Sequence, residues 1–456
     1  MRRGDSIGPP PGDGWTTEGM IMRHMRLFAL LGISPLLCSA AAADDLPTKT
    51  LAECITIAVQ QHPSLKAAGA AVDAGHQRVW EAASNYLPQV SANYLANRRN
   101  SSVSARVGGS ATGLGTQSQT FNFYNTGVSF TQVLFDFGQT LASIRSAQAS
   151  EQSLEADLST QRDTVVLNVK QSYFNLLAAK RLLVVADETV RQSQKHLEQA
   201  QGRYDVGMAP KFDVTNVQVQ LAQSELNQVT ARNNVAVARE TLRNALGLVG
   251  PLDFDIVDDF GRRRMPITTE AALALAYDKR PELQSIQAQE RSTEERVASL
   301  QRNLLPNVSG NGTYNWTGSD YPLQSSWNIG AAVNLSVFNG GLTIAQIGEA
   351  KANLSNLKFN EDVLRQNIAL EVRQAVINME QAAEAIRVAE KGLQQARENL
   401  ELAEGRYKTG VGNIIELTDA QTSLTTAEAN YVQALYSYQN SVAAVEKSTA
   451  QQLPTT

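Results

Sequence analysis

Hydrophobic and polar positions alternate strictly in two stretches of the second half of the chain. In residues 308–316 the even positions are apolar or glycine and the odd positions are asparagine, serine or threonine; a similar alternation returns in residues 326–337. A period of two predicts β-strands with one apolar and one polar face. The first half repeats the pattern more loosely in residues 89–94 and roughly 124–135. We therefore expect two β-hairpins, which supply four strands.

Four strands are too few to close a membrane barrel within one chain. Strands with an uncharged polar face are typical of a barrel with a wet interior, and Tyr314, Trp316 and Trp327 lie near one end, where an interfacial aromatic girdle would sit. The smallest such barrels have about eight strands, and unpaired edges are not tolerated in hydrocarbon. A membrane barrel therefore needs two or three chains. A soluble sheet with one solvated face is the alternative.

Two stretches, residues 138–202 and 342–405, predict very long helices, because neither contains a proline. At ~1.5 Å per residue each would span about 95 Å. Apolar residues recur at spacings of three and four, which favours coiled-coil packing. In the first stretch these residues include Val166, Val169, Tyr173 and Leu176. Shorter helices at residues 65–85 and 212–246 would stack end to end beside the first long helix. An ordinary coiled coil is the alternative.

Four short motifs of the first half return in the same order in the second half. The pairs are His62-Pro63 with Arg280-Pro281, Leu87-Pro88 with Leu305-Pro306, Phe135-Asp136-Phe137-Gly138 with Phe338-Asn339-Gly340-Gly341, and Gly202-Arg203-Tyr204 with Gly405-Arg406-Tyr407. Such self-similarity indicates two copies of one structural unit. We expect a first repeat at residues 44–247, a belt-forming linker at 248–268, a second repeat at 269–447 and a tail at 448–456. The glycine-rich residues 108–115 predict an exposed loop.

The N-terminal residues 1–43 have the features of an export signal. A basic cluster that ends at Arg26 precedes an apolar run to Leu37, and small residues up to Ala43 follow. This is the order of a secretory signal peptide, so we expect cleavage after Ala43. Residues 1–19 do not fit that order and are interpreted as an upstream extension. The initiator would then be Met20, Met22 or Met25.

The two cysteines bear on how the chain is processed. Cys38 raises the possibility of a lipoprotein, but Leu37 stands before it, where bacterial lipoprotein signals carry a small side chain. We therefore expect no lipidation. Cleavage after Ala43 would leave Cys54 alone, so no disulfide could form within the mature chain and a buried thiol is expected.

Composition and charge argue against several classes of function. The net charge is −5 and charged residues make up 19% of the chain, so no footprint for nucleic acid is present. His24, His62, His76 and His196 lack the spacing of metal ligands, and His196 is placed on a polar helix surface. Neither a nucleophile elbow nor a phosphate-binding loop occurs. We expect no enzyme activity and no cofactor. After residue 43 no apolar stretch reaches the ~20 residues that a membrane helix needs.

The repeated motifs together resemble the TolC family of outer-membrane efflux proteins over nearly all of residues 44–456. The paired Leu-Pro strand entries, the Phe-Asp-Phe-Gly and Phe-Asn-Gly-Gly strand exits and the paired Arg-Tyr-x-x-Gly turns carry this resemblance. It implies a fold that is mainly α with membrane β-structure, in which each subunit has four strands and long coiled helices. It further implies a homotrimer with a twelve-stranded β-barrel and an α-helical tunnel. The location would be the outer membrane of a Gram-negative bacterium, extending into the periplasm.

The turn after each long helix is the candidate site for gating. Gly410 can take a positive φ and reverse the chain, and Glu416 and Asp419 share one face of the next helix near its N-terminus. In a trimer these carboxylates would form a ring that attracts cations. The closing contacts that the resemblance implies are Tyr407, Asp213, Glu416 and Asp419.

The same turns are the candidate docking site for a partner. The residues concerned are Gly207, Gly410, Arg203, Arg406 and Tyr204. Family members often carry an arginine where this chain has Gly412, so the hydrogen bonds of the implied gate would differ in detail. As alternatives, Glu416 and Asp419 would only cap and solubilise a helix, and Tyr204 and Tyr407 would be packing residues.

These features favour a subunit of an outer-membrane export channel in a tripartite efflux or type I secretion system. The resemblance implies a periplasmic adaptor (membrane fusion) protein and an inner-membrane transporter as partners, with outer-membrane lipid around the barrel. The transporter would power the movement of substrate, and the generic polar residues of the lumen do not specify the cargo. The alternative is a structural or adhesive trimer in which a barrel anchors a coiled coil. Such proteins normally place the anchor at one end, whereas here the strands interrupt the helices twice.

Overall fold

The computed structural model describes residues 47–102, 118–258 and 267–451. The chain divides into two units, Met1–Asp45 and Leu46–Thr456, and the elements below belong to the second. The expected signal peptide with its cleavage site, Cys38, the glycine-rich loop and most of the expected tail lie outside the described residues.

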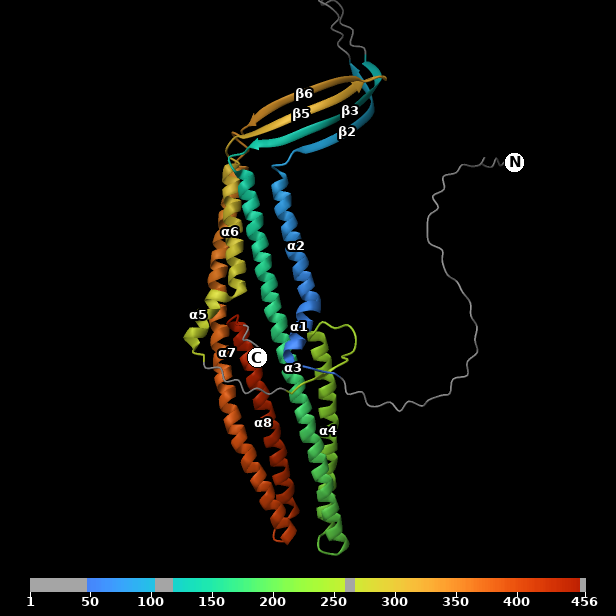
Figure 1. Ribbon diagram of the computed structural model, residues 1–456, viewed down its shortest axis with the longest axis vertical. Helices are drawn as coiled ribbons and strands as arrows, with labels where there is room; N and C mark the ends of the chain where they lie inside the picture. Colours follow the sequence, from blue (N-terminus) through green and yellow to red (C-terminus); the bar gives the residue numbers. More distant parts are fainter. Residues whose placement is uncertain (1–46, 103–117, 259–266, 452–456) are drawn as a thin grey trace, which may run out of the picture. The chain divides into compact units, whose positions relative to one another are not determined.

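The same order of elements occurs twice along the second unit: two short helices, two strands, a very long helix and a helix of intermediate length (Figure 1). The first set comprises α1 (Leu51–Gln61), α2 (Pro63–Ser84), β2 (Gln89–Ser102), β3 (Ser118–Phe135), α3 (Gln139–Asp205) and α4 (Lys211–Ala245). The second set comprises α5 (Thr269–Lys279), α6 (Pro281–Arg302), β5 (Asn307–Gly318), β6 (Gln324–Asn334), α7 (Leu342–Thr409) and α8 (Ile414–Ser448). Two further strands that the sequence did not predict, β1 (Thr48–Lys49) and β4 (Asp255–Ile256), pair in parallel.

Strands β2, β3, β5 and β6 form one antiparallel sheet in that order. Residues paired directly across strands share a face, so the register gives the composition of each face. One row across the sheet consists of Val90, Phe130, Gly312 and Ile329. The next row, on the opposite face, consists of Ser91, Ser129, Thr313 and Asn328. The register thus confirms the alternation of apolar and uncharged polar positions.

The first hairpin is longer than the sequence pattern predicts. β2 and β3 have 14 and 18 residues, against 12 and 11 in β5 and β6. Because β3 pairs with β5 only from Tyr124 onward, the residues before it continue as a ribbon with β2. β6 ends at Asn334 rather than at Val337, because Asn334 already pairs with Asn307, the first residue of β5. Pro306, with no N–H to donate, precedes that residue.

The two long helices, α3 of 67 residues and α7 of 68, both begin after a glycine in the left-handed conformation. Gly138 has φ 82° and Gly341 has φ 83°, a region that glycine adopts without steric cost. Before α3, the carboxylate of Asp136 accepts hydrogen bonds from the backbone N–H of Gly138 (3.0 Å) and of Thr140 (2.7 Å). It thereby satisfies donors that the first helical turn leaves free. Over the described residues, we find no helix with the length and apolar character needed to cross a membrane.

The predicted helix at residues 65–85 is preceded by a second one that the sequence pattern missed. α1 and α2 meet at Pro63, which cannot continue α1 but fits the first position of a new helix. The end of α4 abuts this junction, since a Cβ added to Gly247 would lie 2.8 Å from the Cα of His62. α2 and α4 therefore follow one another along α3, as expected.

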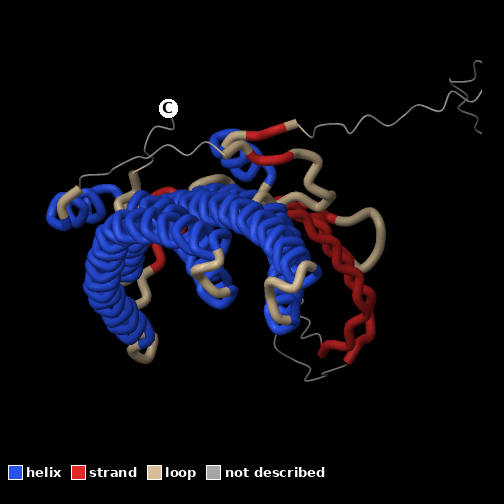
Figure 2. Tube along the Cα trace, turned by 90° about the horizontal axis from the view of Figure 1, so that it is seen from below, coloured by secondary structure: helices blue, strands red, loops and turns tan. Residues whose placement is uncertain are grey.

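The long helices stand side by side in a curved row when viewed from one end (Figure 2). Near the sheet the neighbours are α2, α3, α6 and α7; away from it they are α4, α3, α8 and α7. Three buried apolar clusters hold them: one joins α1, α2, α3, the end of α4 and Tyr436 of α8; one joins α5, α6, α7 and α8; and one joins the far tips of α3, α4, α7 and α8. Cys54 lies in the first cluster as the expected buried thiol, and burial raises its pKa to about 11.

Candidate functional site

The two tip turns close through the same backbone hydrogen bonds. In each, two N–H groups beyond the helix donate to the carbonyls of its arginine and tyrosine, which is the Schellman arrangement. After α3 the donors and acceptors are Met208 to Arg203 (2.8 Å) and Gly207 to Tyr204 (2.9 Å). After α7 they are Val411 to Arg406 (3.0 Å) and Gly410 to Tyr407 (3.1 Å). Gly207 and Gly410, with φ of 76° and 79°, supply the left-handed residue that this turn requires.

Gly412 lies too close to the end of α7 to carry a side chain. A Cβ atom at this position would be 2.9 Å from the Cβ of Arg406 and 3.2 Å from the backbone nitrogen of Tyr407. Its N–H also donates to the carbonyl of Arg406 at 2.9 Å, which fixes the approach. This turn therefore excludes the arginine that the family resemblance implies at position 412.

Arg203 and Tyr407 join the ends of the two long helices. The guanidinium of Arg203 lies 4.5 Å from the ring centroid of Tyr407, and its Nη2 donates to the carbonyl of Lys408 at 3.1 Å. Tyr407 is only 3% exposed, so this cation–π contact is largely desolvated and contributes about 0.5–2 kcal/mol. Burial raises the pKa of the Tyr407 phenol; Arg203 opposes this change and the charge of Asp213 adds to it.

A second pair of side chains lies on the exposed surface of the same tip. Asn413 caps α8 by accepting the backbone N–H of Glu416 at 2.8 Å. The carboxylate of Glu416 lies 3.3 Å from Nε of Arg406, and both side chains are about half exposed. An ion pair in such a setting contributes about 0–1 kcal/mol. The contact orders the turn but does not lock it.

Most residues predicted for the tips meet in two groups. Arg203, Tyr407 and Asp213 form one group, and Arg406 and Glu416 form the other. Gly207 and Gly410 shape the turns, while Tyr204 and Asp419 are exposed and belong to neither group. Their parts in gating and docking stay predictions.

Comparison with known proteins identifies the fold that carries these tips. The family model described as outer membrane efflux protein matches residues 54–248 and 272–451. The chain belongs to the outer membrane efflux protein family. Outer membrane protein TolC of Escherichia coli (strain K12) is 24% identical over 395 residues, which cover 83% of this chain and 77% of TolC. Outer membrane efflux protein BepC of Brucella suis is 22% identical over 396 residues, which cover 85% and 82%.

Solved structures show the same fold. The CmeC outer membrane channel of Campylobacter jejuni has a TM-score of 0.78 and 19% identity, covering 89% of this chain and 87% of CmeC. A CusC structure has a TM-score of 0.76 and 17% identity, covering 91% and 95%. The predicted family, the TolC-like and mainly helical fold, the channel function and the outer-membrane location are thereby confirmed. The family is one of channel and transport proteins.

One residue of this efflux protein lies elsewhere than its sequence neighbours predict. The placement of His196 on a polar helix surface is wrong, because its ring is 5% exposed and faces Gln421 of α8. The exposed residues next to it, such as Lys195, hide the pattern. The sequence did contain a sign that His196 is buried. Small or polar residues recur at helical spacing on the same face of α3, and they are buried too: Thr189, Ser193 and Ala200.

These buried positions line what we call the tip seam, the contact of α3 with α7 and α8 between Thr189 and Arg203. The hydroxyls of Thr189 and Thr425 lie 3.1 Å apart across it. Ser193 makes an equivalent hydroxyl contact of 3.1 Å with Ser224 of α4. The contact of Thr189 with Thr425 thus joins the two repeats of the efflux protein beside the apolar cluster of the tips, whereas that of Ser193 with Ser224 joins α3 to α4.

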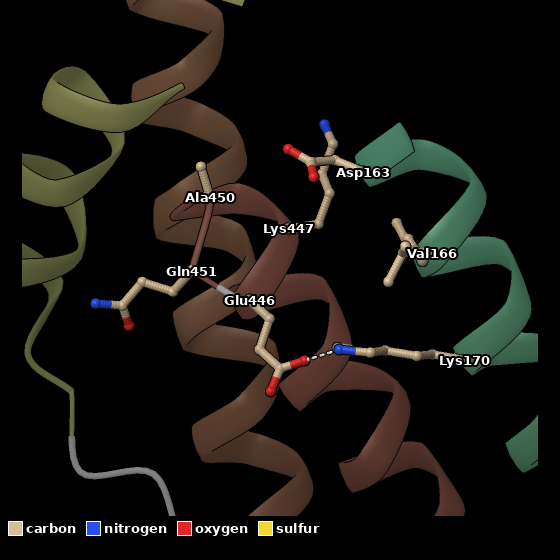
Figure 3. A pocket seen from close by; sticks show the side chains of 9 residues that line it. Asp163, Val166, Lys170, Glu446, Lys447, Ala450 and Gln451 are labelled. Atoms are coloured by element: carbon tan, nitrogen blue, oxygen red, sulfur yellow. Dashed lines mark hydrogen bonds and ion pairs between the residues drawn. The ribbon is translucent and has the colours of Figure 1, made fainter. Parts of the chain in front are cut away.

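An ion-pair network at the opposite end of α8 is a second feature that the sequence pattern missed. Arg280, 2% exposed, donates to the carboxylate of Glu371 at 2.7 Å, and Lys447 donates to the same carboxylate at 2.8 Å. Beside them, Lys170 of α3 pairs with Glu446 of α8 across a small pocket (Figure 3). The network ties the end of α8 to α3, α6 and α7.

Three charges of this network, those of Arg280, Glu371 and Lys447, have no charged counterpart in the first repeat. In the first repeat the positions that correspond to Arg280, Glu371 and Lys447 are taken by uncharged residues or histidine, namely His62, Asn168 and Asn244. Burial alone would raise the pKa of Glu371, but the hydrogen bonds from Arg280 and Lys447 lower it below its ordinary value. A position-by-position comparison of the two repeats would have identified these three charged residues from the sequence.

Proposed function

We propose that this protein is one of three identical subunits of an outer-membrane channel that exports substrates in a tripartite efflux or type I secretion system. The observation that carries the proposal is the open sheet. Among the described strands, β2 pairs with β3 alone and β6 with β5 alone, so both edges are free. Free edges are not tolerated in hydrocarbon. Joining β6 of one copy to β2 of the next would remove them, and three copies would give about twelve strands, an accepted barrel size.

The two faces of the sheet support contact with lipid on one side and water on the other. Large apolar side chains on one face are exposed in the single chain, among them Val90, Tyr94, Val128, Tyr314, Trp327, Ile329 and Val333. The opposite face carries asparagine, serine and threonine at the register positions. Outer-membrane barrels alternate in this way around a hydrated interior.

The helices at the two ends of the row support closure by copies of the same chain. α4 exposes Phe212, Val219 and Leu226, which recur at every seventh position. α7 exposes Ile377, Val388 and Leu402, which are separated by nearly whole numbers of helical turns. Such stripes are typical of a coiled-coil contact. In a ring of subunits α4 of one copy would meet α7 of the next, which would bury both stripes.

The gate of the channel is proposed to be the tip seam. Arg203 holds the end of α7 through Tyr407, with Asp213 nearby, while Glu416 and Asp419 would place carboxylates around a narrow entrance. The cation–π contact and the exposed ion pair contribute about 2 kcal/mol or less each. These contacts therefore add little to the apolar cluster that holds the tip of α7 and α8 against α3, so the gate can open without breaking a strong ion pair.

The tip turns are proposed to dock a periplasmic adaptor, which would connect the channel to an inner-membrane transporter. Exposed apolar side chains gather beside Gly207 and Gly410: Val206, Met208, Val411 and Ile415. Arg203, Arg406 and Tyr204 add charged and aromatic contact groups there. A surface that combines apolar residues with arginine and tyrosine has the composition of a protein interface.

The proposal is tested by substitutions on the two faces of one strand. Ile329→Asp puts a charge on the apolar face and is expected to prevent assembly of a trimer in the outer membrane, because charges on the lipid-facing side of a barrel strand are destabilising. Its neighbour Asn328→Asp, on the polar face, should still give a trimer. Recovery of both variants as membrane trimers, or a wild-type chain that stays monomeric in outer-membrane extracts, would overturn the proposal.

A further inference from the structure

Several buried polar atoms of the tip seam have no hydrogen-bond partner within the described part of the chain. They are both ring nitrogens of His196, Oε1 of Gln421 and the hydroxyl of Tyr407. His196 is 5% exposed and Gln421 is 4% exposed, so neither side chain is satisfied by full contact with solvent. Buried polar groups in folded proteins are paired as a rule, and a cluster of exceptions along one contact requires an explanation.

The surroundings of His196 combine burial with charges of both signs. Its ring faces Gln421 of α8 and Gln199 of its own helix, and the charged groups that act on it are Glu404 and Lys408 of α7. Burial has the largest effect and lowers the pKa of His196; Glu404 opposes this effect and Lys408 adds to it. On the side of α4 the neighbouring contact is neutral, from Ser193 to the hydroxyl of Ser224.

We propose that His196 is a proton-sensitive latch of the tip seam, which stays closed while the ring is neutral and parts when the ring is protonated. The inference rests on the proposed function, because it takes the tip seam to be the gate. An imidazolium ring has two N–H donors and a full charge, whereas the closed seam offers it one unpaired carbonyl oxygen, that of Gln421. Opening the seam hydrates the ring and so removes the burial that has the largest effect on its pKa, while it separates the ring from both Glu404 and Lys408, whose effects oppose each other.

The direction of the response follows from linkage between protonation and opening. The pKa of His196 in the closed seam is lowered relative to an exposed histidine, so protons bind the open state more strongly. The closed seam is therefore most stable at a pH above the ordinary histidine pKa of about 6.5, and it becomes less stable as the pH falls below this value. Three copies in a trimer would make the response steeper than that of one ring.

The experiment compares currents through whole trimers in planar bilayers at about pH 7.5 and about pH 5.5, which bracket the ordinary histidine pKa. Acidification is expected to raise the open-channel occupancy of the wild type several-fold. His196→Gln, which cannot titrate, should abolish the rise. The matched control His76→Gln removes an exposed histidine that contacts Glu151 on a different helix pair, and it should leave the rise unchanged. An equal response in wild type and His196→Gln would overturn the latch.

A second variant reverses the sign of the effect. Gln421→Glu places a carboxylate opposite the ring, so protonation would create an ion pair in the closed seam and raise the pKa of His196 there. Acid would then favour the closed channel and lower its occupancy. Acid opening of Gln421→Glu to the same extent as the wild type would contradict the proposal, even if His196→Gln failed to fold.

A distance measurement separates the latch from the export function. Spin labels at Glu198→Cys on α3 and Ser423→Cys on α8, both exposed positions, report the width of the seam, while buried Cys54 escapes labelling. The label distance should lengthen in acid in the wild-type background and stay constant with His196→Gln. Conducting trimers whose distance ignores pH would overturn the latch alone. Non-conducting trimers whose distance responds would overturn the export function alone.

Discussion

The guanidinium of Arg203, from the first Arg-Tyr turn, lies 4.5 Å from the ring centroid of Tyr407, from the second. Each repeat therefore contributes one residue to the contact that joins the tips. The other two members of these motifs have different surroundings, since Tyr204 is 41% exposed and Arg406 faces Glu416. The arginine and the tyrosine of the two motif copies thus make different contacts, and the tip seam lies between the two copies.

The unpaired hydroxyl of Tyr407 gives the first prediction. Tyr407→Phe should leave channel closure unchanged, because no described residue bonds the hydroxyl. Arg203→Gln removes a contact of about 0.5–2 kcal/mol and should raise the resting conductance of the trimer in a planar bilayer. If Tyr407→Phe raised the conductance as much as Arg203→Gln, the hydroxyl rather than the ring would hold the gate, contrary to this account.

The close approach of Gly412 to α7 gives the second prediction. Gly412→Ala should lower the stability of the trimer by about 1–3 kcal/mol, because the new Cβ meets the Cβ and backbone of Arg406. Gly392→Ala, in the interior of α7 with open space around it, is the matched control and should stabilise by about 0.5–1 kcal/mol. Thermal unfolding followed by circular dichroism measures both. Equal melting temperatures for the two variants would show that position 412 is not restricted.

The carboxylates of the α8 N-terminus give the third prediction. Glu416→Ala together with Asp419→Ala should raise the conductance or reduce the preference for cations, because three copies of each would surround the entrance. Glu398→Ala together with Glu401→Ala removes two exposed carboxylates of the same spacing from α7 and serves as the control. Reversal potentials in a salt gradient report the selectivity. Unchanged currents and potentials in the first pair would remove these residues from the gate.

The ion-pair network at the end of α8 gives the fourth prediction. Arg280→Met leaves Glu371 with Lys447 alone and should destabilise the protein at neutral pH by about 1.5 kcal/mol, the lower end for a hydrogen bond to a charged group, because Glu371 is itself 42% exposed. Arg387→Met, which breaks an exposed pair with Glu384, should have no measurable effect. The measurement is the trimer melting temperature as a function of pH.

The pH dependence of that network has a defined sign. The pKa of Glu371 is lowered in the folded protein by its hydrogen bonds to Arg280 and Lys447. The stabilisation is therefore present above the ordinary glutamate pKa of about 4.3 and is lost as the pH falls through the lower folded value. Arg280→Met should flatten this acid-induced loss. A variant as acid-sensitive as the wild type would show that Arg280 does not stabilise the charge.

The parts of the fold that follow local periodicity were predictable from the sequence. Alternation at residues 308–316 gives β5 and its two faces, and the absence of proline gives the extent of α3 and α7. The junction at Pro63 was readable too, because proline at the first position marks a new helix. These signals are strong because each residue of the element repeats the same physical preference.

The parts that depend on contacts between distant segments were not predictable in this way. His196 lies among polar neighbours in sequence, and its burial follows from the packing of α8 onto α3. Glu371 of α7, which accepts from Arg280, lies far along the chain, as does Lys447 of α8, which donates to the same carboxylate. Likewise, the exclusion of a side chain at Gly412 depends on how tightly the turn closes on Arg406. Sequence identifies such residues only when the two repeats are compared position by position.

The proposed export function requires that three copies of this chain close one conducting channel. Current through purified wild-type trimers in a planar bilayer tests it most directly, with the trimer confirmed by mass in the same preparation. Trimers should give discrete ionic conductance steps, and Ile329→Asp, which should not insert, should give none. Folded wild-type trimers that insert into the bilayer but pass no current at any voltage or pH would contradict it.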